Sequence, residues 1–213
     1  MVIQMIQELI IVFLLCSTVF FLGISRLRTL IRLFAVQSLF LGLIPILIHP
    51  SFSIRLTSLS LLTVLFKTLI FPFLLLRTIK KIKINCEVEP YVNYLYSLFF
   101  GFLYLILSMS LSSMLNAETK LNFTLTTAFF MLFTGLFIIM SRKKAITQIL
   151  GYLVFENGIF LLGFVLVPEI PLLIEISVLL DVFVAVFIMN VIIYNIDKEF
   201  AHIDIDKLNH LKG

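Results

Sequence analysis

The sequence predicts an all-α integral membrane protein that crosses the bilayer seven times. Of its 213 residues, 61% are hydrophobic and only 13% are charged, and the mean hydropathy is +1.16. Soluble domains carry far more polar surface than this. The apolar runs are mostly about 20 residues long, the length that a helix needs to cross roughly 30 Å of hydrocarbon, and charged residues separate them.

Each predicted span is an apolar run that is bounded by polar or charged flanks. The seven spans follow one another along the chain at 4–24, 29–49, 52–76, 91–115, 122–140, 146–167 and 171–195. Since the largest polar segments are only a loop near 77–90 and a tail at 196–213, the chain has no room for a soluble domain. Any redox or nucleotide chemistry is therefore expected on a partner.

Basic residues follow the first, third, fifth and seventh spans. Of the 16 lysine and arginine residues, only Arg55, Lys67 and Lys120 lie elsewhere. Because basic loops stay in the cytoplasm, this pattern predicts an N-terminus outside and a C-terminus in the cytoplasm. The net charge of +4 is then an orientation signal, with lipid head groups as a second contact and no need for nucleic acid.

An internal similarity suggests two related units. Residues 25–42 and 141–158 match at Ser25 and Ser141, Arg26 and Arg142, Arg28 and Lys144, and Gly42 and Gly158. Four matches in an apolar background are also compatible with chance. A true repeat would give two parallel three-helix units, as known in transport folds. The single membrane domain, 1–213, then divides into a first unit (1–77), a linking helix (91–115), a second unit (122–195) and a cytoplasmic tail (196–213).

Three ionisable residues, Lys67, Glu156 and Asp181, fall near the middle of predicted spans. A charge at the bilayer centre costs roughly 2.5–3.5 kcal/mol on insertion scales, so each is expected to face the bundle interior or water. Glu156 and Asp181 lie on consecutive antiparallel spans at similar depth and are expected to face each other. Two such carboxylates can exchange protons. Glu156 and Asp181, together with Lys67, are therefore the candidate proton relay.

Structural roles remain open for the same residues. The carboxylates could hydrogen-bond across helices or pair with a lysine, and Lys67 could neutralise a carboxylate of a partner, because the first three spans show no acid at its depth. Gln37 and Ser38 could bridge helices or hold water. Asn157 offers a polar neighbour to Glu156, with the following glycine allowing close helix approach or a π-bulge, and Glu175 could lie at an outer mouth.

No metal, haem or nucleotide site is expected. The tail contains His202, Asp204, Asp206 and His210, but its alternating apolar residues favour an amphipathic peptide that docks on a partner. The two cysteines, Cys16 and Cys86, form no CxxC motif, and no P-loop or Ser–His–Asp arrangement is present.

Several stretches together resemble a known family. "RKKAITQILGYLVFENGIFLL" (142–162), followed by "LLDVFVAVFIMNVII" (179–193), resembles subunit K of complex I, with Glu156 and Asp181 in the places of its two membrane carboxylates. The longer chain, "FAVQSLFLG" (34–42), Lys67 and the closing "LKG" are similar to hydrogenase-4 component E, the extended relative of subunit K. The chain departs from subunit K in having Asp181 instead of glutamate, and Gln37 and Lys67 instead of a carboxylate pair in the first unit.

The resemblance implies a membrane-arm subunit of a bacterial or archaeal inner membrane complex. Such a subunit lies between antiporter-like subunits, which are linked to a peripheral nickel–iron hydrogenase or related redox module with iron–sulfur centres. It moves protons or sodium ions and carries no cofactor of its own, so the chain itself would not be the catalytic subunit. A scaffold that only joins ion-translocating subunits, and a free-standing ion transporter, are the alternatives.

Overall fold

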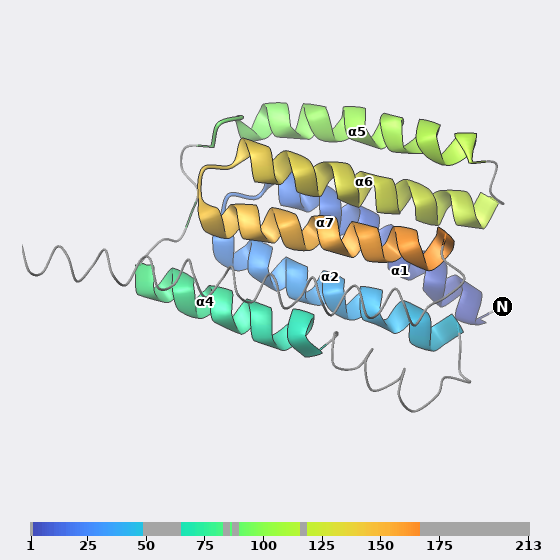
Figure 1. Cartoon of the computed structure of the whole chain (residues 1–213), viewed down its shortest axis with the longest axis horizontal. Helices are drawn as coiled ribbons and strands as arrows, with labels where there is room; N and C mark the ends of the chain where they lie inside the picture. Colours follow the sequence, from blue (N-terminus) through green and yellow to red (C-terminus); the bar gives the residue numbers. More distant parts are fainter. Residues whose placement is uncertain (1, 49–64, 83–85, 87–89, 116–118, 167–213) are drawn as a thin grey trace, which may run out of the picture.

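The structure of the chain, a computed structural model, describes residues 2–48, 65–82, 86, 90–115 and 119–166. Every named element in these ranges is a helix, as the sequence predicts (Figure 1). The elements are α1 (Val2–Gly23), α2 (Leu27–Ile48), the π-helical turn η1 (Phe66–Ile70), α4 (Phe71–Ile82), α5 (Tyr94–Met114), α6 (Thr119–Ser141) and α7 (Ala145–Leu166).

Five helices in the described part of the chain are long and apolar enough to cross a membrane. They correspond to the first, second, fourth, fifth and sixth predicted spans, and the qualifying stretches are Met5–Gly23, Leu27–Ile44, Tyr94–Met114, Leu121–Ser141 and Ala145–Leu166. The seventh predicted span, 171–195, and the larger part of the third, 52–76, lie outside the described residues. A helical bundle with five candidate membrane helices is thus confirmed, while the number seven and the orientation stay predictions.

The helix of the third span continues beyond its predicted end at residue 76, because α4 extends to Ile82. The prediction took Arg77 as the end of the helix, yet Arg77 and Lys80 lie within α4 with exposed side chains. Basic residues near a helix C-terminus interact favourably with the helix dipole, and their long side chains reach water. The first charge therefore marks the edge of the apolar stretch and not the end of the helix.

Helices α1, α2, α6 and α7 form the centre of the bundle. Helix α1 packs on α2 and α6, α7 packs on α2 and α6, and α5 covers α1 and α6. Helix α4 and η1 pack on α2 at the opposite side of the bundle (Figure 1). Helices α1 and α6 run in the same direction, and so do α2 and α7 (Figure 1). Two parallel units require this arrangement, but the third helix of the second unit lies outside the described residues, so the repeat stays a prediction.

Two glycines bring α6 and α7 into close contact. A Cβ atom added at Gly135 would lie 2.6 Å from the backbone nitrogen of Phe155, and one at Gly158 would lie 2.9 Å from the backbone nitrogen of Leu132. Small residues at a membrane helix interface allow the backbones to approach in this way. The contact holds the rotation and depth of the α7 segment that carries Glu156.

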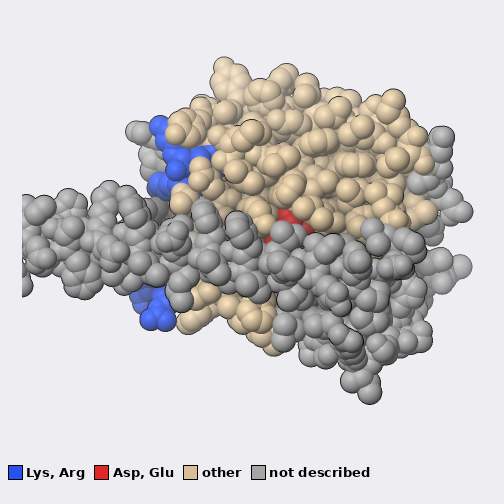
Figure 2. Space-filling model, viewed as in Figure 1, with Lys and Arg blue, Asp and Glu red and all other residues tan. Residues whose placement is uncertain are grey.

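Basic side chains gather at one end of the bundle. Figure 2 shows lysine and arginine side chains together at the left end of this face. The turn from α1 to α2, the end of α4 and the turn from α6 to α7 all lie at this end (Figure 1). This segregation is the pattern on which the predicted orientation depends.

One residue of this basic end, Arg142, is buried with 1% of its surface exposed. Its guanidinium donates hydrogen bonds to the carbonyl oxygen of Leu22 at 3.0 Å, to the carbonyl oxygen of Val92 at 3.3 Å and to Oγ of Ser97 at 3.3 Å. It also lies 4.4 Å from the centre of the Tyr94 ring. Counting Arg142 as a loop charge was therefore incomplete, because it ties the ends of α1, α5 and α6 together.

Candidate functional site: a buried lysine–glutamate pair

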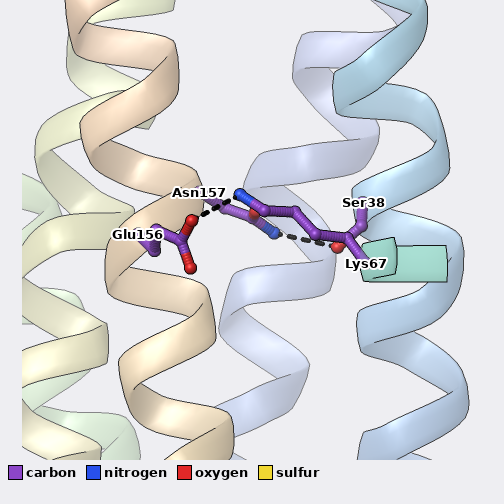
Figure 3. A network of polar contacts seen from close by, with 4 residues as sticks. All are labelled: Ser38, Lys67, Glu156 and Asn157. Carbon is purple, nitrogen blue, oxygen red and sulfur yellow. Dashed lines mark hydrogen bonds and ion pairs between the residues drawn. The ribbon is translucent and has the colours of Figure 1, made fainter. Parts of the chain in front are cut away.

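A lysine and a glutamate meet inside the described part of the bundle. Nζ of Lys67 lies 2.8 Å from Oε1 of Glu156, and their side chains are only 6% and 1% exposed (Figure 3). Glu156 is near the middle of α7, and Lys67 belongs to η1, which packs on α2. Two opposite charges at this distance neutralise each other in a place where either one alone would be costly.

Polar side chains extend the site from α7 to α2. Asn157, the neighbour of Glu156, donates a hydrogen bond from Nδ2 to Oγ of Ser38 at 3.2 Å (Figure 3). Asn157 and Ser38 are both buried. The ion pair and this hydrogen bond together join α7, α2 and η1 across the interior of the bundle.

A second polar contact joins α2 to α1. Nε2 of Gln37 donates to Oγ1 of Thr18 at 3.1 Å, and the Thr18 hydroxyl donates to the carbonyl oxygen of Leu14 at 2.7 Å. Thr18 is fully buried, and the sequence interpretation did not single it out. The adjacent Ser17 and Thr18 within an otherwise apolar run were the signal that could have identified it.

Several buried oxygens of the site can accept further hydrogen bonds. Among the described residues, no donor reaches Oε2 of Glu156, Oδ1 of Asn157 or Oε1 of Gln37. Buried acceptors usually find a donor, either a side chain or an ordered water. The site is thus rich in acceptors and can receive a proton donor beside the Lys67 ammonium.

Two of the three residues of the predicted relay lie together, while the relay itself stays a prediction. The structure places Lys67 on Glu156, whereas Asp181 and Glu175 lie outside the described residues, so the facing of Glu156 and Asp181 stays a prediction. A carboxylate from a partner is not needed to account for Lys67, because Glu156 of the same chain pairs with it. The sequence interpretation left pairing with a lysine open for Glu156, but it searched for the partner of Lys67 only in the first three spans and so did not name this pair.

The π-bulge that was considered beside Asn157 is not there, because α7 is a regular α-helix from Ala145 to Leu166. The π-helical turn lies instead at Phe66–Ile70 and carries Lys67. Close helix approach at Gly158, the other expectation, is what the structure has. Within the described ranges no group of three or more His, Cys, Asp or Glu residues could hold a metal ion, and the tail from 196 lies outside them.

Comparisons with known proteins find sequences similar to this chain. Residues 123–213 match the family model of the NADH-ubiquinone/plastoquinone oxidoreductase chain 4L, which is subunit K of complex I. This match covers less than half of the chain, so it shows a similarity of the C-terminal part to that family. The resemblance to hydrogenase-4 component E is confirmed as well: over 79 residues the chain is 34% identical to that protein from Escherichia coli K12 and from Shigella flexneri.

The extent of these matches differs. The segment shared with hydrogenase-4 component E covers 37% of this chain and 37% of those relatives. An uncharacterized protein of Mycobacterium tuberculosis is 28% identical over 190 residues, which is 87% of this chain and 86% of the relative. No solved structure matches the chain with a significant score. The chain is thus similar to subunit K over residues 123–213 and to hydrogenase-4 component E over 79 residues.

Proposed function

We propose that the chain is a membrane-arm subunit of a complex I-related redox complex of the membrane-bound hydrogenase type, and that Glu156 carries protons through it. Similarity to the chain 4L family and to hydrogenase-4 component E supports a subunit of a multisubunit membrane complex. The observation that carries the relay is the Lys67–Glu156 pair, 2.8 Å apart and almost completely removed from solvent.

The pair couples a proton to a movable charge. When Glu156 takes up a proton, its negative charge disappears and the Lys67 ammonium loses the partner that neutralised it. The ammonium is then favoured to move toward another acceptor, or to pass its charge on, because an uncompensated buried cation is costly. When Glu156 releases the proton, for which Asp181 is the proposed recipient, the ammonium is drawn back. Proton movement and rearrangement of the bundle are thereby linked.

The partners are proposed from the same relationship. Antiporter-like subunits would flank this chain in the membrane, and a peripheral hydrogenase or related module would carry the nickel–iron and iron–sulfur centres. In a bacterial or archaeal inner membrane, the basic end of the bundle would face the cytoplasm. Coupling to the redox module is then electrostatic and conformational, since the proposal assigns this chain no cofactor.

The relay is tested by removing its charges one at a time. Glu156→Gln and Asp181→Asn keep the size of each side chain, and we expect either change to lower proton pumping by the assembled complex in vesicles while redox turnover continues. Glu8→Gln, at an exposed glutamate of α1, is the matched control and should pump normally. Intact assembly with undiminished pumping in both relay variants would refute the proposal.

A scaffold role is the second candidate, and a specific observation favours it. The ion pair and the Asn157–Ser38 hydrogen bond brace three helices, as assembly contacts would. If the site only braces, the same substitutions lower the yield of the complex, while the complexes that do assemble keep their normal ratio of protons to electrons.

A further inference from the structure

Lys67 lies within a local change of helix type. In η1 the backbone N–H of Phe71 bonds to the carbonyl oxygen of Phe66, five residues back, as in a π-helix. The residues at either side, Leu65 and Phe71, have ordinary α-helical dihedral angles, with φ of −63° and −62°. The π-helical turn therefore holds one residue more than an α-helical turn and continues directly into α4.

Pro72 supplies the physical cause of this turn. Proline has no N–H to donate, and in an α-helix its ring collides with the carbonyl group four residues earlier, here that of Thr68. A wider turn at Phe66–Ile70 moves this carbonyl away from the ring. Pro72 is the second residue of α4, so its missing N–H falls where the helix changes type. Pro72 is itself buried, so its position is held by packing.

The π-helical turn determines the direction of the Lys67 side chain. An α-helix rotates about 100° per residue. A π-helical turn contains one more residue, so each of its residues rotates by a smaller angle. If the turn relaxed to α-helix, Lys67 would rotate about the helix axis by a large part of one residue step. Its ammonium would move by several ångström, whereas Glu156 would stay, because the contact at Gly158 holds α7 on α6. The 2.8 Å contact would be lost.

We propose that Pro72 is a positioning residue for the site: it imposes the π-helical turn that holds Lys67 against Glu156. The effect of this positioning on proton movement rests on the proposed function. Its effect on the Lys67–Glu156 contact does not, and the two effects are measured separately.

The geometric test is a double-mutant cycle in the purified complex. Lys67→Met and Glu156→Gln are made singly and together, and their coupling is read from the thermal midpoint of this subunit. With Pro72 in place we expect strong coupling. In the Pro72→Ala background the coupling should vanish, whereas Pro45→Ala, a matched change of the proline within α2, should leave it intact. Coupling that persists in the Pro72→Ala background overturns the proposal.

A compensating deletion keeps the test decisive if Pro72→Ala alone does not assemble. Removing Thr68 together with Pro72→Ala converts the π-helical turn to an α-helical one and returns Lys67 to nearly its original direction. This variant should assemble and recover the coupling, and failure to recover it refutes the positioning role. Pumping is measured on the same samples and should fall several-fold in Pro72→Ala and return with the deletion. If the coupling behaves as expected but Glu156→Gln pumps normally, the proposed function fails and the positioning role stands.

Discussion

Breaking the Lys67–Glu156 pair from one side should destabilise the protein far more than removing both charges. Lys67→Met leaves the Glu156 carboxylate in a site where its side chain is 1% exposed. At an effective dielectric constant of about 20, two unit charges 2.8 Å apart attract each other by about 6 kcal/mol. Desolvation offsets part of this attraction, and the measured cost of removing one partner of a buried pair is roughly 3–5 kcal/mol.

The assay is thermal unfolding of the purified complex, followed by a probe on this subunit. A loss of this size should lower the midpoint of Lys67→Met by about 10 °C. The double variant Lys67→Met with Glu156→Gln leaves no buried charge and should recover most of this loss. A double variant as unstable as Lys67→Met alone would show that the two side chains do not pair in the assembled protein, and the reasoning would be wrong.

Three further predictions concern the contacts that hold the site. Gly158→Ala places a methyl group 2.9 Å from the backbone of Leu132, so it should destabilise the α6–α7 contact by about 1–3 kcal/mol, measured by thermal unfolding; an unchanged midpoint contradicts the close approach. Arg142→Lys loses the forked guanidinium that reaches three acceptors and should lower stability by about 2 kcal/mol, with Lys143→Gln as an exposed neighbouring control. Asn157→Ala removes the hydrogen bond to Ser38 and should cost about 1 kcal/mol while pumping per redox turnover stays normal; a lost proton ratio would instead place Asn157 in the relay.

The elements that were predicted well are those governed by the local chain. The first, second, fourth, fifth and sixth spans appear as helices within a few residues of their predicted limits, because the length of an apolar run reports directly on the cost of exposing backbone to lipid. The end of α4 was wrong for a related reason. Hydropathy locates the edge of the membrane, whereas hydrogen bonding decides where a helix stops. Arg77 lies beyond the apolar stretch but still within the helix.

The candidate site was only partly predictable. Glu156 and Lys67 stand out along the chain because a charge in an apolar run is rare. Their pairing is not visible in the sequence, since Lys67 and Glu156 lie on helices that meet only after the bundle has formed. The burial of Arg142 was hidden in the same way, because a basic residue beside Lys143 and Lys144 has the pattern of a solvated loop until the ends of three helices close over it.

The sequence by itself determined that the chain is a bundle of membrane helices with ionisable groups inside and a cluster of basic residues between helices, since hydrophobicity and charge act locally. Only the tertiary structure decided that Lys67 meets Glu156 within one chain. This contact depends on how α2, α7 and η1 are rotated against one another. That rotation follows from packing at positions such as Gly158, which no single stretch of sequence reveals.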